Sequence, residues 1–154
     1  MRRRAAFVTG GRRGIGRAIA VALSEDGFDV VVNDIVEDEA VAETLDAIRA
    51  TGRRATFVCG DIADLQAQDA LVDAAWAAFG GIDCHVNNAG VQTSFRGDML
   101  DVPPESFDRL VNINMRGTYF LSQRIARRML AEPGHSSTRP ERSMFFLSSG
   151  NAVI

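Results

Sequence analysis

Lysine is missing from the sequence, since all 17 basic residues are arginine. A Walker-type P-loop needs a lysine to reach its phosphates, so this absence excludes that class of nucleotide site. Long apolar runs are missing too, because none approaches the roughly 20 residues needed to span a bilayer. The sequence therefore predicts neither a P-loop NTPase nor a membrane protein.

Cysteine is scarce as well. Cys59 and Cys84 lie far apart and match no metal or redox spacing. We interpret both as small core residues of a reduced, cytoplasmic protein, and we predict no metal site. Positive charge is not in surplus, because the formal net charge at pH 7 is -3. A general nucleic-acid binder would show a basic surplus, so the sequence does not favour that class.

What the sequence does contain is a regular alternation of strand-like and helix-like segments. Short apolar runs rich in β-branched residues alternate with segments whose apolar side chains recur at helical spacing. This pattern predicts one α/β domain, a doubly wound parallel sheet with strand order 3-2-1-4-5 and helices on both faces. The predicted strands span residues 5–9, 28–34, 55–59, 83–87 and 143–149, and the predicted helices span 14–25, 37–50, 65–79 and 104–130.

A glycine-rich loop joins the first predicted strand to the first predicted helix, at residues 9–16. Gly10 permits a tight turn, Gly14 lets the backbone approach a pyrophosphate, and Gly16 lets the helix pack closely. The helix N-terminus offers free N–H groups and a positive dipole end to phosphates. We therefore predict a dinucleotide site here that includes Arg13 and Ile15.

Asp34 ends the second predicted strand, where a carboxylate can accept both hydroxyls of an adenosine ribose, as in NAD sites. The alternative is a solvated turn residue. Arg13 leaves NADP open, because an arginine there could hold its 2′-phosphate. That phosphate would meet the charge of Asp34, so NAD is the favoured cofactor and NADP the less favoured one. Arg12 is interpreted as a solvated loop residue.

Five motifs in order along the chain resemble those of the short-chain dehydrogenase/reductase family, and most nearly its 3-oxoacyl-[acyl-carrier-protein] reductase branch. They are Thr-Gly-x-x-x-Gly-x-Gly at 9–16, Asp-Ile at 61–62, Asn-Asn-Ala-Gly at 87–90, Asn-Met-Arg-Gly at 114–117 and Ser-Ser at 148–149. The resemblance implies a Rossmann fold and NAD(P)-dependent interconversion of a secondary alcohol and a ketone on a small-molecule substrate. It also implies a homotetramer or homodimer.

The resemblance assigns roles to single residues. It implies adenine contacts at Asp61 and Ile62. Asn88 and Gly90 would lie beside the nicotinamide ribose, and Ala89 between them is a further predicted cofactor contact. Ser149 would donate a hydrogen bond to the substrate oxygen during hydride transfer. Asn114 would hold a water in a proton relay.

Asn114 also stands out by its spacing. It lies seven residues after Phe107 and seven before Leu121, which predicts a place on the buried stripe of its helix. The alternative to the relay is a core amide satisfied by neighbouring backbone, because a buried amide must be hydrogen-bonded.

The family's chemistry depends on a Tyr-x-x-x-Lys pair beyond the serine. This sequence has one tyrosine, Tyr119, which is followed four residues later by Gln123. We therefore expect residues 1–154 to be an incomplete domain of a longer polypeptide, nearly inactive by itself, since positioned acid/base groups contribute about 10²–10⁴-fold. The alternative is a catalytically dead nucleotide-binding or regulatory protein.

Overall fold

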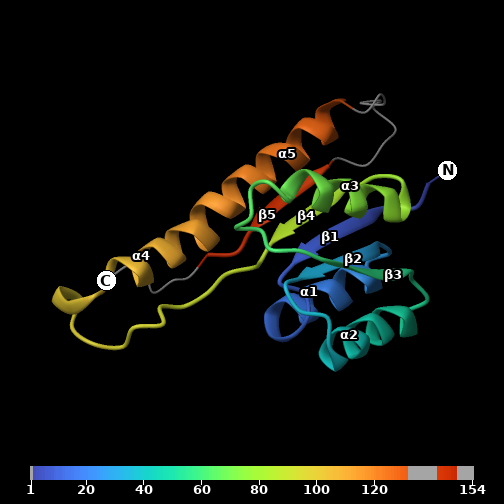
Figure 1. Cartoon of the computed structure of the whole chain (residues 1–154). Coiled ribbons are helices and arrows are strands. Elements are labelled where there is room, and N and C mark those ends of the chain that lie inside the picture. Colours follow the sequence, from blue (N-terminus) through green and yellow to red (C-terminus); the bar gives the residue numbers. More distant parts are fainter. Residues whose placement is uncertain (1, 132–141, 149–154) are drawn as a thin grey trace.

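The computed structural model describes residues 2–131 and 142–148. These residues form one parallel sheet in the order β3-β2-β1-β4-β5 (Figure 1). The strands are β1 (Ala5–Thr9), β2 (Asp29–Asp34), β3 (Ala55–Cys59), β4 (Cys84–Asn87) and β5 (Ser143–Phe146). The predicted doubly wound sheet and its strand order are confirmed.

Helices cover both faces of the sheet. α1 (Gly14–Glu25) and α2 (Glu39–Ala50) lie on one face, and α3 (Gln68–Phe79) and α5 (Thr118–Ala131) lie on the other (Figure 1). Alternate residues of β1 enter the two cores: Ala6 and Val8 pack toward α1 and α2, whereas Phe7 packs toward α3 and α5. A strand buried on both faces needs apolar residues at every position, which explains the continuous apolar runs of the sequence.

The predicted single helix over 104–130 is wrong in its middle. The chain forms α4 (Pro104–Leu110), then a π-helix, η2 (Val111–Gly117), and then α5; a short 3₁₀ turn, η1 (Met99–Asp101), precedes α4. Pro103 and Pro104 do open the helix, at its N-cap and first position, as predicted. A π-helix has a wider turn than an α-helix, so it changes which side chains share a face.

The two cysteines differ in their surroundings, and both are free thiols. Cys84 is buried in β4, as predicted, and burial raises the pKa of its thiol. Cys59 is exposed, so its prediction as a core residue is wrong. It is the last residue of the edge strand β3, and its Sγ lies 3.6 Å from the carbonyl oxygen of Ile35.

β5 lies at the other edge of the sheet. Its Phe145 and Phe146 are 55% and 57% exposed, one on each face. Across the described ranges, no helix has the length and apolar character needed to cross a membrane. Nor do those ranges contain three His, Cys, Asp or Glu side chains grouped to hold a metal ion.

Candidate functional site

A cleft of about 450 Å³ opens at the carboxyl ends of β1, β2, β3 and β4. Parallel strands bring these ends to one edge of the sheet, where open α/β sheets hold their ligands. Every predicted cofactor-contact residue except Gly14 lines it, namely Gly10, Arg13, Ile15, Gly16, Asp34, Asp61, Ile62, Asn88, Ala89 and Gly90. Other lining residues were not predicted to contact the cofactor, among them Arg12, Ile35, Val91 and Arg109.

The glycines of the loop between β1 and α1 are required for different reasons. Gly10 and Gly14 have φ of +64° and +56°, a region that favours glycine. A Cβ on Gly14 would meet nothing within 4 Å, whereas a Cβ on Gly16 would collide with the carbonyl of Gly10 and the amide of Asn88. Gly14 therefore serves backbone conformation, and Gly16 serves the close approach of α1 to the cleft wall.

The first turn of α1 is open to an anion. Its N-cap residue, Arg13, has extended backbone and makes no side-chain capping hydrogen bond, and no acidic residue lies in the first turn. The orphan N–H groups of a helix start carry a partial positive charge that favours phosphate. The cleft therefore has a local preference for an anion at the start of α1.

Hydrogen bonds join the glycine loop to the segment after β4. The hydroxyl of Thr9 accepts from the backbone N–H groups of Asn88 and Ala89 at 3.2 and 3.1 Å. The side-chain amide of Asn88 donates to the carbonyls of Thr9 and Gly10, both at 3.0 Å. Two walls of the cleft are thus held together, and Asn88 is a positioning residue for the glycine turn.

The Asp61–Ile62 wall of the cleft is held from behind by a side chain that the sequence did not indicate and that does not itself line the cleft. Gln68 is fully buried, and its amide donates to the carbonyls of Ile62 and Gly117 at 2.7 and 2.9 Å. Asp61 accepts a hydrogen bond at 2.8 Å from the backbone N–H of Ala63, which forms a turn at the cleft edge. Gln68 therefore ties the Asp61–Ile62 segment to the end of the π-helix.

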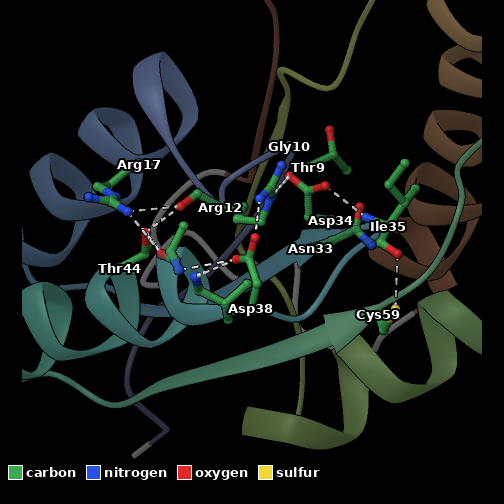
Figure 2. A network of polar contacts seen from close by, with 12 residues as sticks. Thr9, Gly10, Arg12, Arg17, Asn33, Asp34, Ile35, Asp38, Thr44 and Cys59 are labelled. Carbon is green, nitrogen blue, oxygen red and sulfur yellow. Dashed lines mark hydrogen bonds and ion pairs between the residues drawn. The ribbon is translucent and has the colours of Figure 1, made fainter.

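Arg12 is not the solvated residue that the sequence suggested. Its side chain is only 16% exposed, because it lies between two carboxylates (Figure 2). Its Nε is 3.7 Å from Asp34 Oδ2, and its Nη1 forms a close ion pair with Asp38. The other oxygen of Asp34 accepts from the backbone N–H of Ile35 at 2.8 Å. The prediction for Arg12 is wrong because Asp38, at the start of α2, was not recognised as its partner.

Asn114 is also placed differently from its prediction. It is exposed rather than buried, and so is Phe107 in α4, so the predicted buried stripe is wrong at both positions. The π-helix also breaks the regular spacing between Phe107 and Leu121 on which the prediction depended. Its side chain pairs with the backbone of Val91 in both directions: Oδ1 accepts from the N–H and Nδ2 donates to the carbonyl, each at 2.8 Å. Asn114 therefore clamps the loop that forms one wall of the cleft.

This clamp leads to a prediction. Asn114→Leu should weaken dinucleotide binding several-fold and lower the free energy of unfolding by about 1 kcal/mol, because two hydrogen bonds to a partly exposed loop are lost. Asn114→Asp keeps the acceptor for the Val91 N–H and should retain more of the binding. Isothermal titration and urea unfolding of both variants measure this. An unchanged dissociation constant in both variants would contradict the clamp.

Ser149 lies outside the described residues, and its neighbour Ser148 is exposed beyond β5. Tyr119 is 62% exposed on α5 and packs edge-on against Phe120.

A sequence model of the short chain dehydrogenases matches residues 4–137. The chain belongs to this family. The chain is similar in fold and sequence to a 3-oxoacyl-[acyl-carrier protein] reductase from Brucella melitensis, solved in complex with NAD. The TM-score is 0.92 and the identity is 42%, and the match covers 100% of this chain and 58% of that one.

Other relatives differ in cofactor and substrate. A short chain dehydrogenase from Burkholderia cenocepacia, in complex with NADP, has a TM-score of 0.73 and 40% identity over 80% of this chain and 50% of that one. The 2-dehydro-3-deoxy-D-gluconate 5-dehydrogenase of Dickeya dadantii is 37% identical over 130 residues, 84% of this chain and 49% of that protein. The chain thus spans about half the length of the curated relatives it matches. The predicted resemblance to the 3-oxoacyl reductase branch is confirmed by the similarity to the Brucella melitensis structure.

Proposed function

We propose that this chain binds a nicotinamide adenine dinucleotide, NAD in preference to NADP. It is then the cofactor-binding part of an oxidoreductase that interconverts a secondary alcohol and a ketone. One observation carries the proposal. A single cleft gathers the glycine loop, an uncapped helix start, Asp34 and the Asn-Asn-Ala-Gly segment at the carboxyl ends of neighbouring strands. The relatives solved with NAD and with NADP support a nicotinamide cofactor in that cleft.

Different residues of the cleft hold different parts of the bound cofactor. Gly14, Ile15 and the first turn of α1 hold the pyrophosphate, and Asp34 accepts from the adenosine ribose. The adenine lies against Asp61 and Ile62, and the nicotinamide ribose against the Asn88–Gly90 segment. When bound, the nicotinamide supplies or accepts the hydride. The protein orients it and excludes water.

Catalytic roles are proposed for Ser149 and Asn114. Ser149 would donate a hydrogen bond to the substrate oxygen as charge develops, and Asn114 would hold a water of a proton relay. Lysine is absent from the 154 residues, and Tyr119 precedes Gln123 rather than a lysine. We therefore propose that these 154 residues bind the cofactor but turn over ketones at least about 10²-fold more slowly than a chain carrying the acid/base pair. The same absence favours a second candidate, a nucleotide-binding protein without catalytic activity.

Binding and turnover test these proposals separately. Titration of the chain with NADH should give a dissociation constant of roughly 1 µM to 1 mM. S-adenosylmethionine, an adenosine ligand that lacks the pyrophosphate, should not compete with NADH for the cleft. Failure of NADH to bind the folded chain at millimolar concentration would contradict the proposed function. Reduction of a ketone panel at the rate of a chain that carries the acid/base pair would contradict the proposed slow turnover, and any reduction above the rate without protein would exclude the second candidate.

A further inference from the structure

The adenosine end of the cleft holds three charged side chains in one network. Arg12 lies between Asp34, at the end of β2, and Asp38, at the N-cap of α2 (Figure 2). The backbone of Arg12 is held as well, because its carbonyl accepts from the Thr44 hydroxyl at 2.7 Å and Thr44 accepts from Arg17 at 2.7 Å. The arginine that faces the cleft is therefore positioned by α1 and α2 together.

The two contacts of the guanidinium are unequal. Nη1 makes the close ion pair with Asp38, whereas Nε stands 3.7 Å from Asp34 Oδ2. That Nε is shielded from solvent and has no hydrogen-bond partner, although Arg12 lines the cleft. A buried donor without a partner is costly, so an acceptor in the cleft that this N–H reaches when the guanidinium turns toward it is favoured.

Asp34 is correspondingly less free than a lone carboxylate. One of its oxygens accepts from the backbone N–H of Ile35, and the other faces the Arg12 charge. An arginine this close offsets the repulsion that the Asp34 charge exerts on a phosphate. The exposed Arg13, which also lines the cleft, adds positive charge.

We infer that Arg12 and Asp38 set the cofactor specificity of this site: Arg12 lets it accept a 2′-phosphate beside Asp34, and Asp38 limits this by holding the arginine. The inference rests on the proposed function and deepens it. The chain binds NAD more tightly, but it also binds NADP, and the difference in affinity depends on Asp38, the N-cap of α2, which lies outside the glycine loop. Removing the Arg12 charge widens this difference, and removing the Asp38 charge narrows it.

Asp38→Asn is a matched variant for this inference. The Asp38 side chain accepts from the N–H groups of Ala40 and Val41 at 3.1 and 3.3 Å, and asparagine caps a helix as well as aspartate does. The substitution therefore keeps α2 capped and removes only the competing charge. Arg12→Gln removes the opposite charge and keeps a polar side chain of similar shape. Arg49→Gln, on the exposed side of α2 where Arg49 pairs with Asp46, controls for the loss of a distant charge.

The experiment is calorimetric titration of the full chain with 5′-ADP and with 2′,5′-ADP at low ionic strength, where charge effects are least screened. The readout is the ratio of the 2′,5′-ADP to the 5′-ADP dissociation constant, which compares two ligands on the same folded protein. The wild-type ratio should be about ten or less. Arg12→Gln should raise it about tenfold, because a charged hydrogen bond to phosphate is lost. Asp38→Asn should lower it about threefold, and Arg49→Gln should leave it within twofold.

The possible results distinguish a wrong assignment of Arg12 and Asp38 from a wrong assignment of the dinucleotide site. A ratio unchanged within twofold in Arg12→Gln, or a ratio that rises in Asp38→Asn, overturns the inference while leaving the dinucleotide site intact. A folded wild-type chain that binds neither ligand at millimolar concentration overturns the proposed function itself. Because the Asp38 and Arg12 variants must move the ratio in opposite directions, general damage to the cleft cannot reproduce the expected result.

Discussion

Gly16→Ala should weaken dinucleotide binding about a hundredfold and lower the free energy of unfolding by about 2 kcal/mol. The added Cβ would collide with the Gly10 carbonyl, and it would lie 2.5 Å from Nδ2 of Asn88. Overpacking of this kind costs about 1–3 kcal/mol, which exceeds the gain of up to about 1 kcal/mol that alanine brings to a helix.

The effect on binding follows from what must move. If α1 shifts away from the Asn88 amide, the helix start no longer faces the turn at Gly10 that Asn88 holds. Loss of two phosphate hydrogen bonds amounts to about 3 kcal/mol, or roughly a hundredfold in the dissociation constant. NADH titration and urea unfolding measure the two effects on one preparation.

Gly52→Ala supplies the control for a glycine far from the cleft. Gly52 has φ of +81° and no atom within 4 Å of an added Cβ, so the substitution strains the backbone without a collision. It should cost about 1 kcal/mol of stability and leave the dissociation constant unchanged. Wild-type affinity in Gly16→Ala would show that α1 need not approach Asn88 so closely.

Much of the fold could be predicted because the central strands are buried on both faces. A run such as Val30–Val32 is typical of a strand in a covered parallel sheet, and the glycine loop then marks where β1 meets α1. The positions of most cleft residues follow, since parallel strands deliver their carboxyl ends to one edge. Local pattern and topology agreed there, so prediction was possible.

The errors lie where a side chain's role depends on a partner distant in sequence. Arg12 looks solvated until α2 brings Asp38 beside it, 26 residues later. Asn114 appears buried if its helix is regular, but the π-helix turns it toward Val91. Gln68 gave no signal, because a buried glutamine is recognised only by the two carbonyls that it joins. Periodicity assumes an ideal helix and cannot register these long-range hydrogen bonds.

His85 should make the folded chain sensitive to mild acid. Its ring is fully buried in β4, stacked on Phe7 at 5.3 Å between centroids. Nδ1 lies 3.1 Å from the Phe7 carbonyl and Nε2 lies 3.1 Å from Asn87 Oδ1, so both hydrogen-bond partners are uncharged. Burial lowers the pKa of His85 to about 4, although these two contacts offset part of the cost of charging the ring.

The sign of the effect follows from proton uptake. The unfolded chain binds a proton at His85 as the pH falls through about 6.5, whereas the folded chain resists protonation until about pH 4. Stability contributed by this group is complete above pH 6.5 and is lost between pH 6.5 and 4. A separation of this size corresponds to about 3 kcal/mol between pH 7 and pH 4.

Asp29 acts in a different range of pH. Burial alone would raise its pKa, but hydrogen bonds from Arg54 and the charge of that arginine lower it below 3.8. Its stabilising effect is lost only at more acidic pH, below the window from pH 6.5 to 4 in which His85 acts.

His85→Gln isolates the histidine, because glutamine can hydrogen-bond to the same strands and does not titrate. Urea unfolding of both proteins at pH values from 7 to 4 should show a stability loss about 3 kcal/mol smaller in the variant than in the wild type. The comparison depends on the change with pH, so a lower stability of His85→Gln at pH 7 does not affect it. Parallel stability curves for the two proteins would show that His85 is protonated in the folded chain as readily as in the unfolded one, and that the core around β4 admits its charge.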